Sequence, residues 1–168
     1  MRQKTHHLTQ AAIIAALYTI LTHLQNTILP GTASWAIQCR ISEALCVLAL
    51  FTPAAIPGLA IGCLLFNITF AAALPLDWII GTAASLTAAW AMWHTRKLTI
   101  KSYPLLGMLM PALTNALLVG WELTIYIGGS YPINALYVAL GELIVVLSLG
   151  SILYFAIRRR KLDTTLFA

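Results

Sequence analysis

The sequence predicts an all-α integral membrane protein, a compact bundle of six transmembrane helices with both termini in the cytoplasm. The 168 residues are 60% hydrophobic and 9% charged, with a mean hydropathy of +0.86, whereas soluble domains carry about 25% charged residues. The apolar residues form six runs near the roughly 20 residues that a spanning helix needs, which fill a single domain over 1–168. These runs are apolar on nearly every face, unlike the alternating strands of a membrane β-barrel.

Proline, glycine and charged residues mark the ends of the six helices. The first helix follows a basic lead, 1–7, and we interpret it as retained rather than as a cleaved signal peptide, because five more apolar runs follow. A basic tail, 158–168, follows the sixth helix. The predicted helices are 8–29, 34–51, 54–74, 78–96, 105–128 and 132–157.

The second run is shorter than the others and carries Arg40 and Glu43. It either spans as a helix or begins as a re-entrant or loop segment, and both interpretations turn it inward, because irregular backbone at membrane depth must be buried or line a wet cavity. At i, i+3 spacing the two residues either pair with each other, or Arg40 reaches a cavity as a counter-charge or a ligand donor.

The positions of the Lys and Arg residues predict how the bundle is oriented in the membrane. With six spans both termini share one side, which then holds every Lys and Arg except Arg40, and the positive-inside rule makes that side cytoplasmic. The net charge of +5 therefore indicates orientation in a lipid membrane rather than nucleic-acid binding. Trp35, Trp78, Tyr126 and Tyr131 fall near the outer boundary, where aromatic residues are enriched.

Several function classes lack their characteristic residues. The chain has no G-x-x-x-x-G-K-[ST] phosphate loop, so a partner would have to supply ATP-driven work. No metal-ligand spacing and no nucleophile with its base are visible, so an enzyme, a metal and a cofactor are not expected. We expect the three cysteines to be buried free thiols, His23 to pack in the core and Asp77 to be the N-cap of the fourth helix.

Two acidic residues, Glu122 and Glu142, lie inside apolar runs. A carboxylate at the middle of a membrane helix costs about 2.5–3.5 kcal/mol, so each requires a partner or a function. The predicted boundaries place them roughly 9 and 15 Å from the outer ends of their helices. Asn115 shares a helical face with Glu122, whereas Asn134 is offset from Glu142 by about 80°.

Two interpretations of these carboxyl groups are open. In the structural one, they bond each other or the backbone and only fasten the bundle. In the functional one, they line a pocket that opens outward between the fifth and sixth helices, roofed by the loop with Trp35 and lined by Trp121 and Tyr131 for stacking. Such a pocket suits a flat, nitrogen-rich, cationic solute.

Small residues recur at four-residue spacing in the first and third helices, which permits close helix contact. Statistics alone favour packing within the bundle. The pairs are Ala11 with Ala15, Ala12 with Ala16, and Gly58 with Gly62.

Several stretches resemble the QueT family. They are IQCRISEAL at 37–45 and LFTPAAIPGL at 50–59, while NALYV at 134–138 and GEL at 141–143 resemble the last helix of the family. The resemblance spans nearly the whole chain. It implies a substrate-binding S component of an energy-coupling-factor (ECF) transporter in the cell membrane, which takes up a vitamin-like solute. That solute would be a queuosine precursor, a 7-deazaguanine such as the 7-aminomethyl or 7-cyano form, captured from outside.

The resemblance also implies partners, namely a transmembrane coupling subunit and two cytoplasmic ATPases, with one of the two alanine pairs of the first helix as the docking face. The implied ligand fits Glu122 and Glu142, because one carboxylate can accept the two N–H donors of a guanine-like edge and the other an aminomethyl cation. The expected binding residues are Glu122, Glu142, Asn115, Asn134, Arg40, Trp35, Trp121 and Tyr131.

Other function classes remain alternatives. A stand-alone secondary transporter would use Glu122 or Glu142 as a proton relay for a small nitrogen-rich heterocycle. A purely structural membrane protein would need these carboxyl groups for stability alone.

Overall fold

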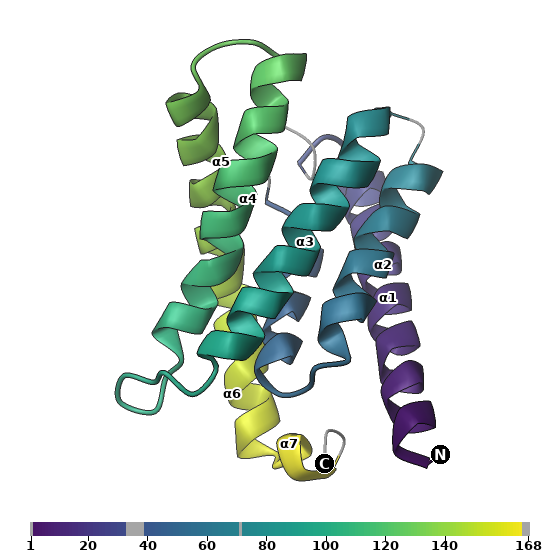
Figure 1. The fold of residues 1–168 in the computed structure, drawn as a ribbon, viewed down its shortest axis with the longest axis vertical. Coiled ribbons are helices and arrows are strands. Elements are labelled where there is room, and N and C mark those ends of the chain that lie inside the picture. Colours follow the sequence, from purple (N-terminus) through teal and green to yellow (C-terminus); the bar gives the residue numbers. More distant parts are fainter. Residues whose placement is uncertain (1, 33–38, 71, 166–168) are drawn as a thin grey trace.

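A computed structural model describes residues 2–32, 39–70 and 72–165, and its long elements are all helices (Figure 1), which confirms the predicted all-α class. In chain order these are α1 (Arg2–Ile28), the 3-10 helix η1 (Ile41–Leu50), α2 (Ala55–Thr69), α3 (Pro75–Thr95), α4 (Leu105–Tyr126), α5 (Tyr131–Val145), the π-helical turn η2 (Val146–Gly150), α6 (Ser151–Arg159) and the short α7 (Leu162–Thr165).

Each predicted run contains a helix, but two runs differ from the simple expectation. In the described part of the second run, which starts at residue 39, the helix begins only at Ile41, and Arg40 before it has an extended backbone. The sixth run is α5, η2 and α6 in unbroken succession. A π-helical turn inside a longer helix often marks a functional site, and this one begins four residues after Glu142.

Helices that follow each other in sequence lie side by side, from α1 against α2 to α4 against α5 (Figure 1). The helix η1 runs through the interior and contacts each of α1 to α6. Its small residues, such as Ser42, Ala44, Cys46 and Ala49, are buried, which lets the surrounding helices approach it closely. At about 2 Å per residue, η1 extends roughly 20 Å.

Close contact between α1 and α2 depends on two glycines. A Cβ atom at Gly58 would lie 2.9 Å from the carbonyl oxygen of Ala11, and one at Gly62 would lie 2.9 Å from that of Ala15. Ala11 and Ala15 are accordingly buried inside the bundle, so they cannot form a docking face for a partner in this structure. The other alanine pair of this helix, 12 and 16, is exposed.

The helices α4 and α5 are joined by the same kind of contact. A Cβ atom at Gly120 would lie 2.7 Å from the Cα atom of Ala135, so only glycine allows this approach. Val119, Leu123 and Val138 form a small hydrophobic cluster beside it. The two helices that carry the predicted carboxyl groups are therefore held at a fixed separation.

Three helices of the described chain are long and apolar enough to cross a membrane: Lys4–Ile28, Leu105–Tyr126 and Tyr131–Arg159. The apolar helices Ile41–Leu50 and Ala55–Thr69 are shorter, and α3 has the length but a more polar composition. The six-span count therefore stays a prediction. Large hydrophobic side chains cover much of the outer surface, among them Ile79, Leu117 and Ile152.

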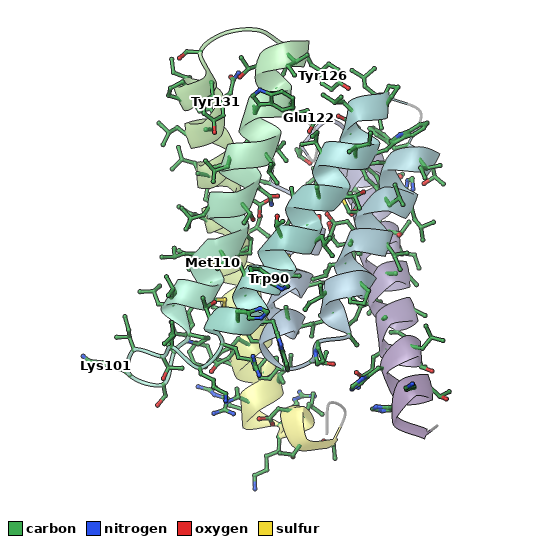
Figure 2. The ribbon with its side chains drawn as sticks, in the orientation of Figure 1. Trp90, Lys101, Met110, Glu122, Tyr126 and Tyr131 are labelled. Atoms are coloured by element: carbon green, nitrogen blue, oxygen red, sulfur yellow. The ribbon has the colours of Figure 1, made fainter. Side chains whose placement is uncertain are left out.

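The start of α1 and the end of α7 lie at the same end of the bundle (Figure 1). The connection between α3 and α4, which carries Lys97 and Lys101, lies at that end too (Figures 1 and 2). The arginines at the end of α6 add to it, and Arg158 forms an ion pair with Asp163 at 3.0 Å. Cationic residues thus gather at one end, while the connection between α4 and α5 lies at the other.

Candidate functional site

A cavity of about 200 Å³ lies inside the bundle and extends toward the end that is opposite the termini. It reaches exposed residues there, including Leu74 and Ile127. Its walls come from α2, α3, α4, α5, η1 and three connecting segments. The lining residues are Arg40, Glu43, Asn67, Ala72, Leu74, Asp77, Gly81, Ser85, Asn115, Val119, Glu122, Leu123, Tyr126, Ile127 and Glu142.

Acidic residues dominate the polar lining. The chain has five Asp and Glu residues, and four of them line this cavity: Glu43, Asp77, Glu122 and Glu142. Among the described lining residues Arg40 is the one cation, so the formal charge is 1 − 4 = −3. Four acidic groups that converge from four different elements are costly unless something positive or hydrogen-bonding balances them.

The innermost acidic residue, Glu43, is held by protein donors. The Tyr18 hydroxyl donates to Oε1 of Glu43, and the Cys46 thiol donates to Oε2 at 3.1 Å. Tyr18 is fully buried, and Glu43 is 2% exposed. Both carboxylate oxygens of Glu43 therefore have partners within the protein.

One face of α1 fixes the segment that carries Arg40 and Glu43. The side chain of Gln25 donates to the carbonyl oxygen of Cys39 at 2.6 Å and accepts from the backbone N–H of Ile41 at 2.7 Å. One turn earlier, the hydroxyl groups of Thr22 and Ser42 form a hydrogen bond at 2.7 Å. Residues 18, 22 and 25 share a helical face, so α1 clamps η1 in register and directs this segment toward the cavity.

Only one of the two carboxylate oxygens of Glu142 has a hydrogen-bond partner among the described residues. The Asn115 amide donates to its Oε1 at 2.6 Å, joining α4 and α5 across the cavity. Its Oε2 is buried and accepts no hydrogen bond from the described residues. The side chain is 4% exposed, so water in bulk cannot compensate the missing bond.

Glu122 presents the same signal from α4. Its side chain is 3% exposed, and its Oε1 accepts no hydrogen bond from the described residues. In Figure 2 it lies near Tyr126, toward the end of the bundle opposite the termini. Buried polar atoms in folded proteins nearly always have partners, so these two carboxylate oxygens could accept hydrogen bonds from a donor that enters the cavity.

The α3 wall is built on a helix start that sequence reasoning assigned incorrectly. Asp77 is not the N-cap but the third residue of α3, and its Oδ2 accepts from the backbone N–H of Leu74 at 2.7 Å. Leu74 occupies the cap position and has no polar side chain, so the carboxylate from the first turn takes over the capping bond. Asp77 therefore faces the cavity as well as the helix terminus.

Asn67 connects α2 to this wall. Its side-chain amide donates to the backbone carbonyl oxygen of Asp77 at 2.7 Å, and the backbone carbonyl oxygen of Asn67 accepts from the Trp78 indole at 3.1 Å. A Cβ atom at Gly81 would lie 2.9 Å from the Asn67 amide nitrogen, so the glycine makes room for it. Asn67 and the buried Ser85 add neutral polar atoms to the lining.

Four of the residues predicted from the sequence line the cavity together, namely Arg40, Asn115, Glu122 and Glu142. The guanidinium of Arg40 lies 5.7 Å from the centre of the Phe66 ring, where a cation–π contact holds it. Arg40 thus reaches the cavity, as one of the two interpretations expected.

The structure places three other predicted residues elsewhere. Trp121 is 49% exposed, because it follows the lipid-facing side of α4 while its neighbour Glu122 points inward. The Tyr131 hydroxyl donates to the carbonyl oxygen of Leu117 on the outer surface at 3.3 Å. The Asn134 amide donates to Thr124 Oγ1 and to the carbonyl oxygen of Gly128, so it secures the connection between α4 and α5. Trp35, expected as the roof, lies outside the described residues.

Sequence reasoning missed Asn67 and Asp77 as cavity residues and treated Glu43 only as a partner of Arg40. A lone Asn in the third apolar run was the available signal for Asn67. His23 was expected to pack in the core but is half-buried: its Nε2 lies 2.8 Å from Thr69 Oγ1, and its ring meets that of Phe66 edge-on at 4.9 Å. Within the described residues, His, Cys, Asp and Glu side chains form no group suited to a metal ion.

A family model described as QueT transporter matches residues 8–159, a range that holds nearly all of the helical bundle and every residue of the cavity. The match identifies a family of transporters rather than of enzymes. Together with the three long apolar helices, it indicates a membrane protein. Comparisons with curated proteins and with solved structures gave no match.

Proposed function

The chain belongs to the QueT transporter family, and on this premise we propose that it is the substrate-binding S component of an ECF-type uptake transporter. It binds a queuosine precursor, a 7-deazaguanine, at the outer side of the cell membrane. A separate module, made of a transmembrane coupling subunit and two cytoplasmic ATPases, drives delivery to the cytoplasm.

The observation that carries this proposal is the pair of buried carboxylates with unpartnered oxygens, Glu122 and Glu142, in one cavity. A 7-deazaguanine presents adjacent N–H donors on its pyrimidine edge, which a carboxylate accepts in a planar, charge-assisted pair of hydrogen bonds. The volume of about 200 Å³ is below the 300–1,000 Å³ typical of pockets for drug-sized ligands, so it favours one small heterocycle.

The charge distribution supports the proposed placement in the membrane. We assign six spans with both termini in the cytoplasm, because cations gather at the end that carries the termini. The acidic cavity then extends toward the exterior, where a scavenged solute arrives. Single-cysteine variants and a membrane-impermeant maleimide test this placement. In intact cells we expect the maleimide to label the Gly128→Cys variant and not the Lys101→Cys variant.

The coupling subunit is proposed to dock on the exposed side of α1. Ala12 and Ala16 lie on that side, next to an apolar groove of about 430 Å³ to which Ile13, Leu17 and Leu153 contribute. Small residues beside an apolar groove permit close contact with a partner helix. Ala16→Leu should therefore abolish ATP-dependent uptake by the assembled transporter without weakening solute binding by the isolated chain.

Direct binding to the purified chain tests the function. Isothermal titration with 7-aminomethyl- and 7-cyano-7-deazaguanine should give saturable binding of at least one of them, with adenine as the control that lacks the matching donor edge. Absence of binding for every 7-deazaguanine, in a chain that unfolds cooperatively, would refute the substrate assignment.

A stand-alone proton-coupled transporter is the second candidate, favoured by the unpartnered Oε2 of Glu142 within an apolar helix. Reconstitution separates the two functions. The S component should bind but not accumulate solute in vesicles without the ATPase module, whereas accumulation driven by a proton gradient alone would establish the second candidate.

A further inference from the structure

Building on the proposed function, we propose that the cavity selects a substrate with a positive charge. In this arrangement Glu142 receives the ammonium group of the ligand, and Glu122 accepts the N–H donors of its pyrimidine edge. The 7-aminomethyl form would then be the preferred precursor, and neutral forms would bind more weakly.

The charges of the cavity support selection of a cation. Arg40 and Glu43 line it from adjacent turns of one segment and cancel formally. Asp77 is partly compensated at the N-terminus of α3, where its Oδ2 accepts a backbone N–H and the helix dipole favours a negative charge. Glu122 and Glu142 remain as an acidic excess over the single cation of the described lining, Arg40, whose charge acts on both of them as well as on Glu43.

A neutral ligand brings no opposite charge for the second carboxylate. The 7-cyano group has no hydrogen-bond donor, and a 7-hydroxymethyl group donates one hydrogen bond but no charge, so this carboxylate stays buried without a cation while the bound ligand excludes water. An ammonium group on the same ligand supplies both the opposite charge and three donors. The residues that face the ligand thus match a molecule with two separate donor groups.

The hydrogen bonds decide which carboxylate takes which group. Asn115 occupies Oε1 of Glu142 and leaves Oε2 as its unpartnered oxygen. One free oxygen suits an ammonium, a compact charge with no fixed geometry, better than a planar pair of N–H donors. No such amide of the described residues holds Oε1 of Glu122, and the Glu122 side chain contacts Asp77 instead. The two N–H donors of the planar edge therefore face an acidic pair rather than a single oxygen.

The depths of the two residues agree with this assignment. Glu122 is four residues from the end of α4, roughly 6 Å, whereas Glu142 is eleven residues from the start of α5, roughly 16 Å. Both helix ends lie at the end opposite the termini (Figure 1). The ligand therefore enters with its ammonium group first and keeps its ring edge nearer the mouth.

The test compares three ligands of nearly equal size by isothermal titration with the purified chain: 7-aminomethyl-, 7-hydroxymethyl- and 7-cyano-7-deazaguanine. The hydroxymethyl form is the neutral counterpart of the amine. We expect the wild-type chain to prefer the amine over it by about tenfold or more, and Glu142→Gln to reduce that preference to about threefold or less. Glu122→Gln should lower the affinity for all three ligands by similar factors.

Controls keep the outcomes separate. Tyr131→Phe, at a residue outside the cavity, should change no affinity, and Glu142→Asp, which keeps the charge, should retain part of the preference even if Glu142→Gln unfolds. Equal wild-type affinity for amine and hydroxymethyl forms would overturn the charge selection while leaving the proposed function intact. Loss of the preference in Glu122→Gln instead of Glu142→Gln would overturn the assignment, and absence of binding by all three would refute the proposed function itself.

Discussion

Two helix pairs in this bundle, α1 with α2 and α4 with α5, are joined by the same kind of contact. The side chains beside the two contacts differ. In both, a glycine on one helix meets the backbone of a small residue on the other, as Gly62 meets Ala15 and Gly120 meets Ala135. The first pair clamps η1 through neutral side chains of α1. The second pair brings Asn115, Glu122 and Glu142 to the cavity.

The difference shows how one packing device serves both scaffold and site. Close backbone contact fixes the distance between two helices. The side chains beside that contact determine whether the helix pair supports the fold or lines the cavity. On α1 the side chains of Thr22 and Gln25 form hydrogen bonds to the η1 segment, and the one buried oxygen without a partner among the described residues belongs to the neutral amide of Asn26. On α4 and α5 the two buried oxygens without such partners belong to carboxylates. Substitutions in the first pair should therefore affect stability, and those in the second should affect binding.

The largest effect is expected from Gly62→Leu in the scaffold pair. A Cβ atom there would lie 2.7 Å from the Cβ of Tyr18, so a larger side chain must separate α1 from α2 and release η1. We expect destabilisation of about 3 kcal/mol, measured by thermal unfolding in detergent. Ile61→Leu, on the lipid-facing side of α2, is the matched control and should unfold like the wild type.

The double variant Glu122→Gln with Glu142→Gln tests the site pair. It should lower the affinity for 7-aminomethyl-7-deazaguanine by about 100-fold, since two charge-assisted interactions are lost. Its unfolding temperature should stay the same or rise, because removing buried charges relieves their desolvation. A lower unfolding temperature together with unchanged affinity would instead indicate that these carboxyl groups only fasten the bundle.

A smaller effect is expected from Tyr18→Phe, which removes the hydroxyl that donates to Glu43. Leaving this buried carboxylate oxygen without its donor should cost about 1–3 kcal/mol, measurable by thermal unfolding. Affinity should fall only a few-fold, because Glu43 lines the cavity but is held by protein donors. Tyr137→Phe, at an exposed tyrosine of α5, is the control; an equal loss of stability there would contradict the role of the Glu43 contact.

The smallest effect is expected from Trp121→Phe, at an exposed position beside Glu122. Stability should change by no more than about 0.5 kcal/mol, and titration should give the wild-type affinity. A tenfold loss of affinity would mean that the ligand stacks on Trp121, as the sequence alone had led us to expect.

Several residues of the site could be predicted from the sequence because burying their polar or charged side chains in apolar helices costs free energy. Glu122, Glu142 and Asn115 interrupt apolar runs, and burial of such groups demands a partner whatever the fold. Arg40 was likewise conspicuous as the cation away from the basic end. These residues indicated a polar pocket between the fifth and sixth predicted helices, whereas the α2 and α3 walls of the cavity were not expected.

Other parts depended on details that periodicity does not encode. The direction of Trp121 and Tyr131 depends on helix phase and ends, where a shift of one residue rotates a side chain by about 100°. The Asn134 amide donates to the carbonyl oxygen of Gly128, in a loop whose two glycines, Gly128 and Gly129, have positive φ. The 3-10 form of η1 and the capping bond of Asp77 arise from tertiary contacts with α1 and from an apolar cap residue.

A structure of the chain with 7-aminomethyl-7-deazaguanine bound tests the central claim most directly. We predict that the ligand lies in the cavity between α3, α4 and α5, with its ammonium nitrogen within about 3 Å of the Glu142 carboxylate and its pyrimidine edge on Glu122. A ligand bound elsewhere, or bound in the cavity without contact to either carboxylate, would contradict the account.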